Sequence, residues 1–256
     1  MAEQVLGDEG ANRVGGVQVP TFAPLYRQIR ALILRSLKDR EWKPGDMIPS
    51  ETELAARFGV SHGTARRAID ELAAENVLVR RQGRGTFVAS HLQRVNQFRF
   101  LKLRPDEGDL ESLGGKVLEC RRTRPTATMA RQLRLRPGEA VILTRRVLRF
   151  GEKGTVLDEI WLPAERFKGF SAEGFESYQG LLYGYLEAEF GVQMLRAEER
   201  LKAVLAQSEQ AEVLGVEVGT PLLQVDRVSF TYEEQPVEVR RGYYDTARHH
   251  YFNHLG

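Results

Sequence analysis

Residues 50–88 read SETELAARFGVSHGTARRAIDELAAENVLVRRQGRGTFV and carry the densest structural signals of the chain. Ser50 and Glu53 have the spacing of a capping box, in which each side chain satisfies a free backbone N–H of the other residue, so a helix begins here. Gly59 supplies the left-handed residue at which that helix ends. Ser61 then caps a second helix. The stretch therefore predicts two short helices joined by a tight turn.

The second helix, expected over residues 62–75, has two different faces. One face is apolar, as in a helix that packs on a core; it contains Ala65, Ala68, Ile69 and Leu72. The opposite face is polar and basic; it contains His62, Thr64, Arg66 and Arg67. Two helices joined by a tight turn that contains glycine, the second helix basic outside, form a helix-turn-helix.

Strand-like runs follow at residues 77–81 and 86–88, joined by Gln82-Gly83-Arg84-Gly85. They predict a hairpin with a basic, glycine-rich tip, and a helix-turn-helix followed by such a hairpin is a winged helix. A further helix is expected to begin after Pro24, because its apolar residues fall on one helical face; these are Leu25, Ile29, Leu32, Ile33 and Leu37.

The charge is unevenly distributed along the 256 residues, although the net charge is only +2. Residues 20–90 contain twelve Lys or Arg against eight Asp or Glu, which gives +4, while residues 1–19 carry −2 and the remainder sums to zero. A local basic excess fits a nucleic-acid partner. A solvated basic face is the alternative that charge alone leaves open.

Several classes of protein are excluded by composition. A single Cys cannot form a disulfide framework. No apolar run approaches the roughly 18 residues that cross a bilayer, and the N-terminus lacks the apolar region of a secretory signal. We therefore expect a cytoplasmic protein without membrane partners. Residues 1–20 are glycine-rich and aperiodic, which predicts a disordered tail.

The remaining sequence predicts a different kind of domain. Residues 91–112 are expected to form a linker leading into an edge strand, and residues 113–256 a domain of many hairpins with few helices. Strands are expected at 117–123, 141–150, 155–162, 198–205, 222–232 and 237–244, and helices at 128–133, 178–190 and 208–214. This pattern is typical of an antiparallel α+β domain.

The order and spacing of these motifs resemble the GntR family of bacterial transcription regulators. KPGD, PSE, LA, FGVS, TxRRAIDEL and RRQGRGTFV, within residues 24–89, match its DNA-binding domain. RPGEAVILTRRVLRF, LDEIWLPAERF, LLYGYLEAEFGV, AEVLGVEVGTPLLQVDRVSF and QPVEVRRGYYDTARHHYF resemble the UTRA ligand-sensing domain of the family's HutC branch. The resemblance implies a winged helix at residues 21–90 and a chorismate-lyase-like effector domain at residues 113–256.

The resemblance also implies a set of DNA contacts on the helix-turn-helix and the wing. They are Thr52, Ser61, His62, Gly63, Thr64, Arg66, Arg67, Gln82, Gly83 and Arg84. Arg66 is expected in the major groove and Arg84 in the minor groove. Two alternatives stay open: Arg67 could be solvated or pair with Asp70 or Glu71, and His62 could stand at the N-terminus of its helix without touching a base.

Three of these positions depart from the family's pattern. Thr52 and His62 stand where the family usually has Arg, and Gly63 stands where it often has a polar residue or Met. An Arg can hold a guanine edge through two hydrogen bonds, which Thr and His cannot do. We therefore expect an operator that differs from the family's common site.

Phosphosugar-sensing members of the family bind their effector with two arginines, two carboxylates, a Ser and two tyrosines. The corresponding residues are Arg146, Leu148, Asp158, Leu181, Tyr183, Glu238 and Tyr244. Leu148 and Leu181 replace two phosphate ligands, so a phosphate held by one cation would be poorly solvated. We expect an effector without a phosphomonoester, such as a small carboxylate or a polar organic molecule with an apolar part.

Simpler interpretations of the same residues stay open. Arg146 could only pair with Asp158 or Glu238, and Asp158 could face solvent. Tyr183 and Tyr244 could be core residues. His249, His250 and His254 lack the spacing of a helical pair or a zinc finger, so neither a metal nor another cofactor is expected.

As a whole, the resemblance implies a ligand-responsive repressor of the bacterial cytoplasm and nucleoid, without catalytic residues. A homodimer would bind a two-fold operator in double-stranded DNA and respond to a small-molecule effector. Two alternatives are a chorismate-lyase-like enzyme fused to a DNA-binding domain and a DNA-binding protein without an effector.

Overall fold

The computed structural model describes residues 13–14, 17–18, 23–91, 100, 102–107, 113–150, 153–178 and 180–253. The chain forms two compact units, Met1–Ala89 and Ser90–Gly256. In the expected N-terminal tail, β1 (Arg13–Val14) pairs with β2 (Val17–Gln18). The rest of residues 1–20 and most of the expected linker at residues 91–112 lie outside the described residues.

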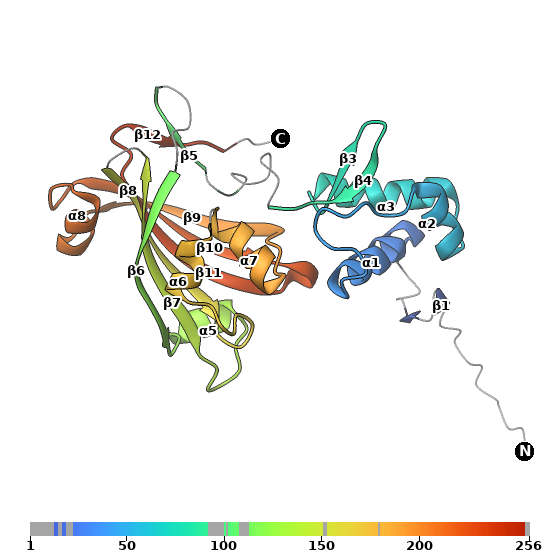
Figure 1. Ribbon diagram of the computed structural model, residues 1–256, viewed down its shortest axis with the longest axis horizontal. Coiled ribbons are helices and arrows are strands. Elements are labelled where there is room, and N and C mark those ends of the chain that lie inside the picture. Colours follow the sequence, from blue (N-terminus) through green and yellow to red (C-terminus); the bar gives the residue numbers. More distant parts are fainter. Residues whose placement is uncertain are drawn as a thin grey trace, which may run out of the picture. The chain divides into compact units, whose positions relative to one another are not determined.

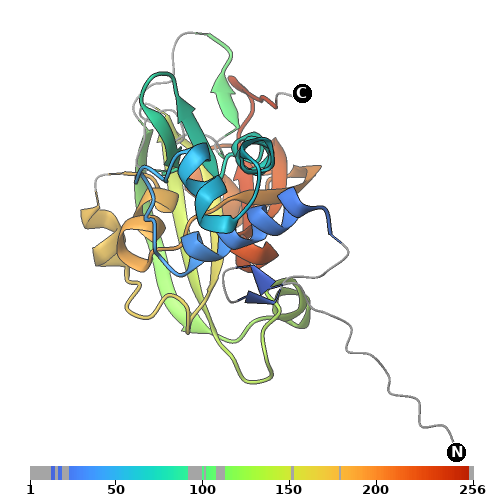
Figure 2. The ribbon, with the colours of Figure 1, turned by 90° about the vertical axis from the view of Figure 1, so that its right-hand side faces the viewer.

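The first unit has the predicted winged-helix order (Figure 1). It contains α1 (Leu25–Lys38), α2 (Glu51–Phe58), α3 (His62–Ala74) and the antiparallel hairpin of β3 (Leu78–Arg81) and β4 (Gly85–Val88). Helix α3 packs against both α1 and α2, as Figure 2 also shows. Its buried residues are the predicted ones, Ala65, Ala68, Ile69 and Leu72.

Local capping residues set the helix boundaries as predicted. Ser50 and Glu53 form both hydrogen bonds of the capping box, and Gly59 ends α2 with a φ of 64°. The prediction for α1 was wrong at one position. Leu25 is 41% exposed, because it is the first residue of the helix and lies outside the core. Gln28 is buried instead, and its Nε2 donates to the carbonyl of Ala23.

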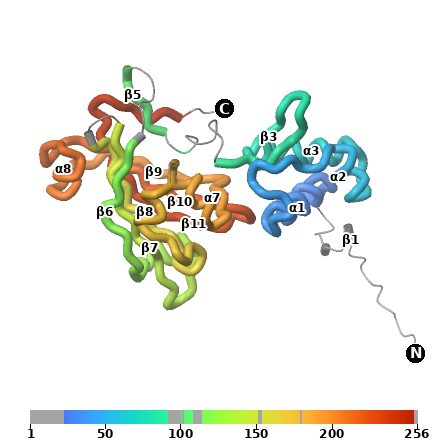
Figure 3. Tube along the Cα trace, in the orientation of Figure 1, coloured from blue at the N-terminus to red at the C-terminus, as the bar shows by residue number. Residues whose placement is uncertain are grey.

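The second unit is built on one antiparallel sheet of six strands, which Figure 3 traces. The strands are β6 (Leu113–Thr123), β7 (Val141–Phe150), β8 (Lys153–Pro163), β9 (Arg196–Leu205), β10 (Pro221–Phe230) and β11 (Pro236–Tyr244). Their order across the sheet is β6-β7-β8-β11-β10-β9, and every pair is antiparallel. The expected α+β class is confirmed.

Helices cover both faces of this sheet. Helices α6 (Ala172–Ser177) and α7 (Leu182–Phe190) lie over one face (Figure 1), in a core that contains Ile160 and Leu162 of β8. Odd-numbered side chains of β8 point to the opposite face of the sheet. There Leu157 packs with α8 (Ser208–Leu214), and Trp161 packs beside the end of α5 (Ala127–Gln132).

Two predictions for this unit were wrong in detail. The helix expected over residues 178–190 begins only at Leu182, as α7, because the chain is extended at Tyr178 and Leu181; α6, which ends at Ser177, was not expected. The short strand in the expected linker, β5 (Leu103–Pro105), does not extend the sheet but pairs with β12 (His249–Tyr251). A 3-10 turn, η1 (Tyr232–Glu234), joins β10 to β11.

Candidate functional site

The winged-helix unit has a groove between the start of α2, the start of α3 and the hairpin. Its volume is about 770 Å³. Four predicted DNA contacts line it: Thr52, His62, Gln82 and Gly83. The other six lie on the first turns of α3 or at the hairpin tip; they are Ser61, Gly63, Thr64, Arg66, Arg67 and Arg84. Thr64 is half-buried and the other five are exposed. The structure thus places all ten on the surface.

The start of α3 is organised by hydroxyl groups. Ser61 Oγ accepts a hydrogen bond from the backbone N–H of Thr64 at 3.2 Å and lies 2.9 Å from the Thr64 hydroxyl. This cap holds the N-terminal turn of α3 open to solvent, where free N–H groups and the helix dipole favour an anion such as a phosphate.

Arg80 of β3 is a residue of this surface that sequence reasoning missed. Its Nη2 lies 2.7 Å from a carboxylate oxygen of Glu51 and 2.6 Å from one of Asp70. His62 Nε2 lies 3.2 Å from the other oxygen of Glu51. Two acids that would repel a phosphate backbone are thereby paired with bases. The hairpin arginine did not stand out in the sequence, because only the fold brings β3 beside α2 and α3.

Arg67 makes a contact that neither sequence interpretation contained. Its guanidinium carbon lies 3.9 Å from the centroid of the Tyr26 ring, on α1. The alternative of an ion pair with Asp70 or Glu71 was wrong for Arg67; it is Arg66 that approaches Asp70, at 3.9 Å. Arg67 therefore joins α3 to α1, and its DNA contact stays a prediction.

Replacement of Arg67 by Ala is expected to lower the free energy of unfolding of the winged-helix unit by about 0.5–1 kcal/mol, the usual range for an exposed cation–π contact. Urea denaturation measures this loss. Arg66→Ala is the matched control: its side chain is 65% exposed, and its removal should change stability by less than about 0.5 kcal/mol. Equal stability of the wild type and Arg67→Ala would contradict the structural role.

The second unit contains a cavity between the sheet and α7. It encloses about 40 Å³ and is lined by Phe100, Arg146, Leu148, Asp158, Leu181, Leu182, Tyr183, Arg227, Arg240 and Tyr244. Six of the seven predicted effector residues are in this set. The seventh, Glu238, lies behind the wall, where it accepts hydrogen bonds from Tyr183 and Arg240.

Strand register explains why these side chains meet. Asp158 of β8 lies opposite Arg146 of β7 on one side and opposite Gly242 of β11 on the other. A Cβ atom at position 242 would come within 3.0 Å of Asp158 Oδ1 and 2.5 Å of the Tyr244 ring. Gly242 therefore leaves the space in which the Asp158 carboxylate and the Tyr244 ring sit.

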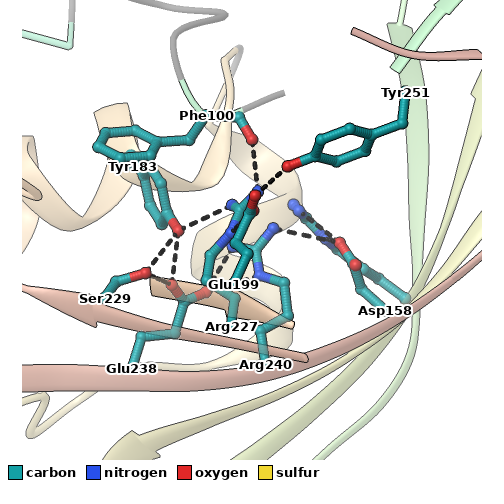
Figure 4. A network of polar contacts seen from close by, with 10 residues as sticks. Phe100, Asp158, Tyr183, Glu199, Arg227, Ser229, Glu238, Arg240 and Tyr251 are labelled. Carbon is teal, nitrogen blue, oxygen red and sulfur yellow. Dashed lines mark hydrogen bonds and ion pairs between the residues drawn. The ribbon is translucent and has the colours of Figure 1, made fainter. Parts of the chain in front are cut away.

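The three arginines of the cavity each pair with a carboxylate. Figure 4 labels both members of two pairs, Arg227 with Glu199 and Arg240 with Glu238, and Asp158 of the third. Arg146 donates from Nε and Nη2 to Asp158 Oδ2 at 3.0 and 2.9 Å. Arg240 Nε donates to Glu238 at 2.7 Å, and Arg227 Nε donates to Glu199 at 2.6 Å. Arg240 also reaches Asp158 Oδ2, at 3.4 Å, and so joins two of the pairs.

These contacts decide the alternatives left open by the sequence. Asp158 is fully buried, so the idea that it faces solvent was wrong. The pairing of Arg146 with Asp158 is confirmed, and both residues also line the cavity. Tyr183 and Tyr244 are buried in core clusters and line the cavity as well. The premise of a single cation was wrong, because Arg227 and Arg240 are also present.

The ionisation of the cavity follows from these pairs. Burial by itself would raise the pKa of Asp158, but Arg240 and Arg146 outweigh burial and hold this pKa below its ordinary value. The pKa of Glu238 is lowered in the same way by Arg240 and Arg227. Burial, with the nearby Glu238, raises the pKa of Tyr183. Its hydroxyl therefore keeps its proton and donates a hydrogen bond to Glu238.

One acceptor in the cavity is unused. Asp158 Oδ1 is buried, and within the described part of the chain it has no hydrogen-bond partner. A buried acceptor without a partner costs free energy, so the cavity favours an occupant that carries an N–H or O–H donor.

Phe100, Leu182, Arg227 and Arg240 were missed by sequence reasoning. A weak signal existed for Arg240, which alternates with Glu238 and Gly242 on one face of β11. Outside the cavity, the two described histidines of the C-terminal cluster lie on β12, with His250 Nδ1 2.9 Å from Asp106; His254 lies outside the described residues. In the described ranges, no helix is long and apolar enough to cross a membrane.

Comparison with known proteins decides the family. The UTRA domain model matches residues 111–250, and the model of bacterial regulatory proteins of the gntR family matches residues 25–88. The chain belongs to the GntR family. The UTRA domain that follows its winged helix makes this GntR-family protein a transcriptional regulator rather than an enzyme.

Individual relatives of this GntR-family protein cover nearly the whole chain. The histidine utilization repressor of Pseudomonas putida is 28% identical, with 89% of this chain and 90% of the relative covered. The repressor NagR of Bacillus subtilis is 26% identical, over 91% and 96% of the two chains. A crystal structure of the ligand-binding domain of a protein described as a GntR-family regulator, from Bordetella bronchiseptica, is 49% identical with a TM-score of 0.59, and covers 60% of this chain and 96% of its own.

Proposed function

We propose that this protein is a dimeric repressor of the bacterial cytoplasm and nucleoid, which binds a two-fold DNA operator and is controlled by a small-molecule effector. The observation that carries the proposal is the cavity in the UTRA domain, whose three arginines are buried and paired with carboxylates, with the unused acceptor Asp158 Oδ1. The names of two relatives, NagR and the histidine utilization repressor, support a repressor. The two-fold symmetry expected of a dimer would match a palindromic site.

The DNA would be bound by the exposed start of α3 and by the wing. Arg66 would contact bases or phosphates in the major groove, and Arg84 at the hairpin tip would reach the minor groove. The Ser61 cap and the N-terminus of α3 suit a phosphate oxygen. Thr52, His62 and Gly63 would give the operator a sequence different from the family's common site, because none of them can hold a guanine as Arg does.

The effector would be a small polar molecule with an apolar part and a hydrogen-bond donor, and without a phosphomonoester. Each cavity arginine already faces a carboxylate, so a phosphate with about two negative charges would add charge that no unpaired arginine of the described lining balances. Leu148 and Leu181 offer it apolar contacts. A donor on the effector would satisfy Asp158 Oδ1.

Selection of binding sites from random DNA tests the DNA-binding part of the proposal. We expect a palindromic sequence that differs from the family's common operator, bound by two copies of the chain as measured by light scattering of the complex. Recovery of the common family operator would contradict the roles of Thr52, His62 and Gly63. Binding of a single copy to a non-palindromic site would contradict the dimer.

Calorimetry with matched ligands tests the effector class. Glucose 6-phosphate and inorganic phosphate are the charged probes, and a metabolite library without phosphomonoesters is screened for release of the selected operator. Tight binding of either phosphate compound would overturn the proposed class. A chain that binds its operator but responds to no small molecule would instead support a DNA-binding protein without an effector.

A further inference from the structure

The cavity in the UTRA domain is too small for a metabolite in its present form. It encloses about 40 Å³, whereas sites for small ligands measure roughly 300–1,000 Å³. Part of the lining must therefore move before an effector can enter. Most lining residues belong to the sheet or to α7, and the arginines are fixed by their ion pairs. Those walls are costly to displace.

Phe100 is the lining residue best placed to move. It lies outside the sheet and outside α7, and its side chain is only half-buried. Its ring meets the Tyr183 ring edge-on, with centroids 5.2 Å apart, and its backbone carbonyl accepts a hydrogen bond from Arg227 Nη2 at 2.6 Å (Figure 4). Residues outside regular structure open at lower free energy than strands and helices do.

The chain enters the second unit at the same place. The backbone N–H of His91 donates to Glu187 of α7 at 2.9 Å, and its Nε2 lies 2.9 Å from the carbonyl of Met194. The His91 ring lies 5.6 Å from Tyr183 and 5.9 Å from Phe100, measured between centroids. His91, Phe100 and Tyr183 therefore form one ring cluster against the cavity wall.

Glu187 reinforces this anchor from inside α7. It is buried, and it accepts hydrogen bonds from the Ser90 hydroxyl and from the N–H of His91. Tyr183 lies one helical turn before Glu187, so the same helix carries a cavity wall and the attachment of the entering chain. A displacement of the Tyr183 or Phe100 ring can thus alter the contacts that hold His91.

We propose that Phe100 is a built-in occupant of the effector cavity, whose ring the effector must displace. This inference rests on the proposed effector function and deepens it. Displacement breaks the hydrogen bond between Arg227 and the Phe100 carbonyl and opens the ring cluster that anchors His91. The side chain at position 100 therefore sets the size of effector that fits, and it links occupation of the cavity to the chain that arrives from the winged helix. Competition with its own ring lowers the apparent affinity for the effector.

The test uses the full-length protein, the variant Phe100→Ala and toluene, which has the shape of the lost side chain. Toluene is expected to raise the Tm of Phe100→Ala by about 2–4 °C and to leave the wild type unchanged, because the space that the ring leaves beside the Tyr183 ring and the Arg227 guanidinium can hold a free aromatic molecule. Hydrogen exchange of the His91 backbone N–H, which donates to Glu187, is expected to be about tenfold faster in Phe100→Ala. Toluene should not slow it, since a free ring no longer holds the chain.

Phe252→Ala is the matched control, because Phe252 is 52% exposed and does not line the cavity; it should resemble the wild type in both measurements. If Phe100→Ala does not fold, Phe100→Leu carries the same comparison. The proposal is overturned if toluene does not bind, if hydrogen exchange at His91 is unchanged within twofold, or if toluene restores the slow exchange, which would make Phe100 a packing residue only. None of these readouts uses DNA or an effector, so they stand apart from a failure of the proposed function.

Discussion

Replacing Arg66 by Ala is expected to weaken binding of the selected operator by about tenfold or more, the usual effect of losing an arginine that contacts a base or phosphate. Arg66 is 65% exposed on α3 and only distantly paired with Asp70, at 3.9 Å. Its guanidinium is therefore free to change partners when DNA arrives. Fluorescence anisotropy over a range of salt concentrations measures both the affinity and its salt dependence.

The salt dependence separates a phosphate contact from a base contact. If Arg66 neutralises one phosphate, the slope of log K against log salt should fall by about one in magnitude, and Arg84→Ala should behave likewise. Arg35→Ala is the control, since Arg35 is exposed on α1 outside the groove and lies 3.6 Å from Asp39. Unchanged affinity and slope in both Arg66→Ala and Arg84→Ala would refute the assigned DNA-binding surface.

Replacing Asp158 by Asn is expected to cost the UTRA domain roughly 3–5 kcal/mol of stability at neutral pH, the range observed when one member of a buried ion pair is removed. Asn has nearly the same shape as Asp, so the loss reports charge rather than volume. Among the described residues, Arg146 would then lose its ion-pair partner, while Arg240 would keep Glu238. Thermal and urea unfolding measure the loss.

The pH dependence of this loss follows from the direction of the pKa shift. The pKa of Asp158 is lowered in the folded protein despite its burial, because Arg240 and Arg146 favour the carboxylate. A lowered pKa stabilises the fold above the unfolded value of about 3.9 and ceases to do so as the pH falls through the folded value. The difference between the wild type and Asp158→Asn should therefore be greatest near pH 7 and shrink below about pH 4.

Asp226→Asn is the matched control for this experiment. Asp226 pairs with Arg241 at 2.7 Å, but both side chains are partly exposed, so water screens the pair and the expected cost is below about 1 kcal/mol. A loss for Asp158→Asn no larger than that of Asp226→Asn would contradict the buried-pair description. Added sulfate should stabilise Asp158→Asn more than the wild type, because the variant leaves positive charge in the cavity uncompensated.

The winged helix could be predicted almost completely from the sequence, because its signals are local. The Ser50–Glu53 box, the left-handed Gly59 and the Ser61 cap act within one turn of the residues that they organise. The exposure of Leu25 and the stacking of Arg67 on Tyr26 were not predicted. Both depend on how far α1 lies from its neighbours, which no local pattern records.

The cavity shows the opposite balance. Family resemblance supplied six of its lining residues. It did not reveal Arg227 and Arg240, because basic residues on a strand usually indicate a solvated face, nor Phe100, which lies outside the strands and helices.

The sequence by itself determined the two units, the helix-turn-helix and the residue types that surround an effector site, since caps, periodicity and motif spacing are properties of short stretches. Only the tertiary structure decided the charge balance of the cavity and the position of Phe100 within it. The partners come from positions as distant as residues 100, 146, 183 and 240. Their meeting depends on strand register and on burial, in which each ion must find a counterion, and these conditions exist only in the folded chain.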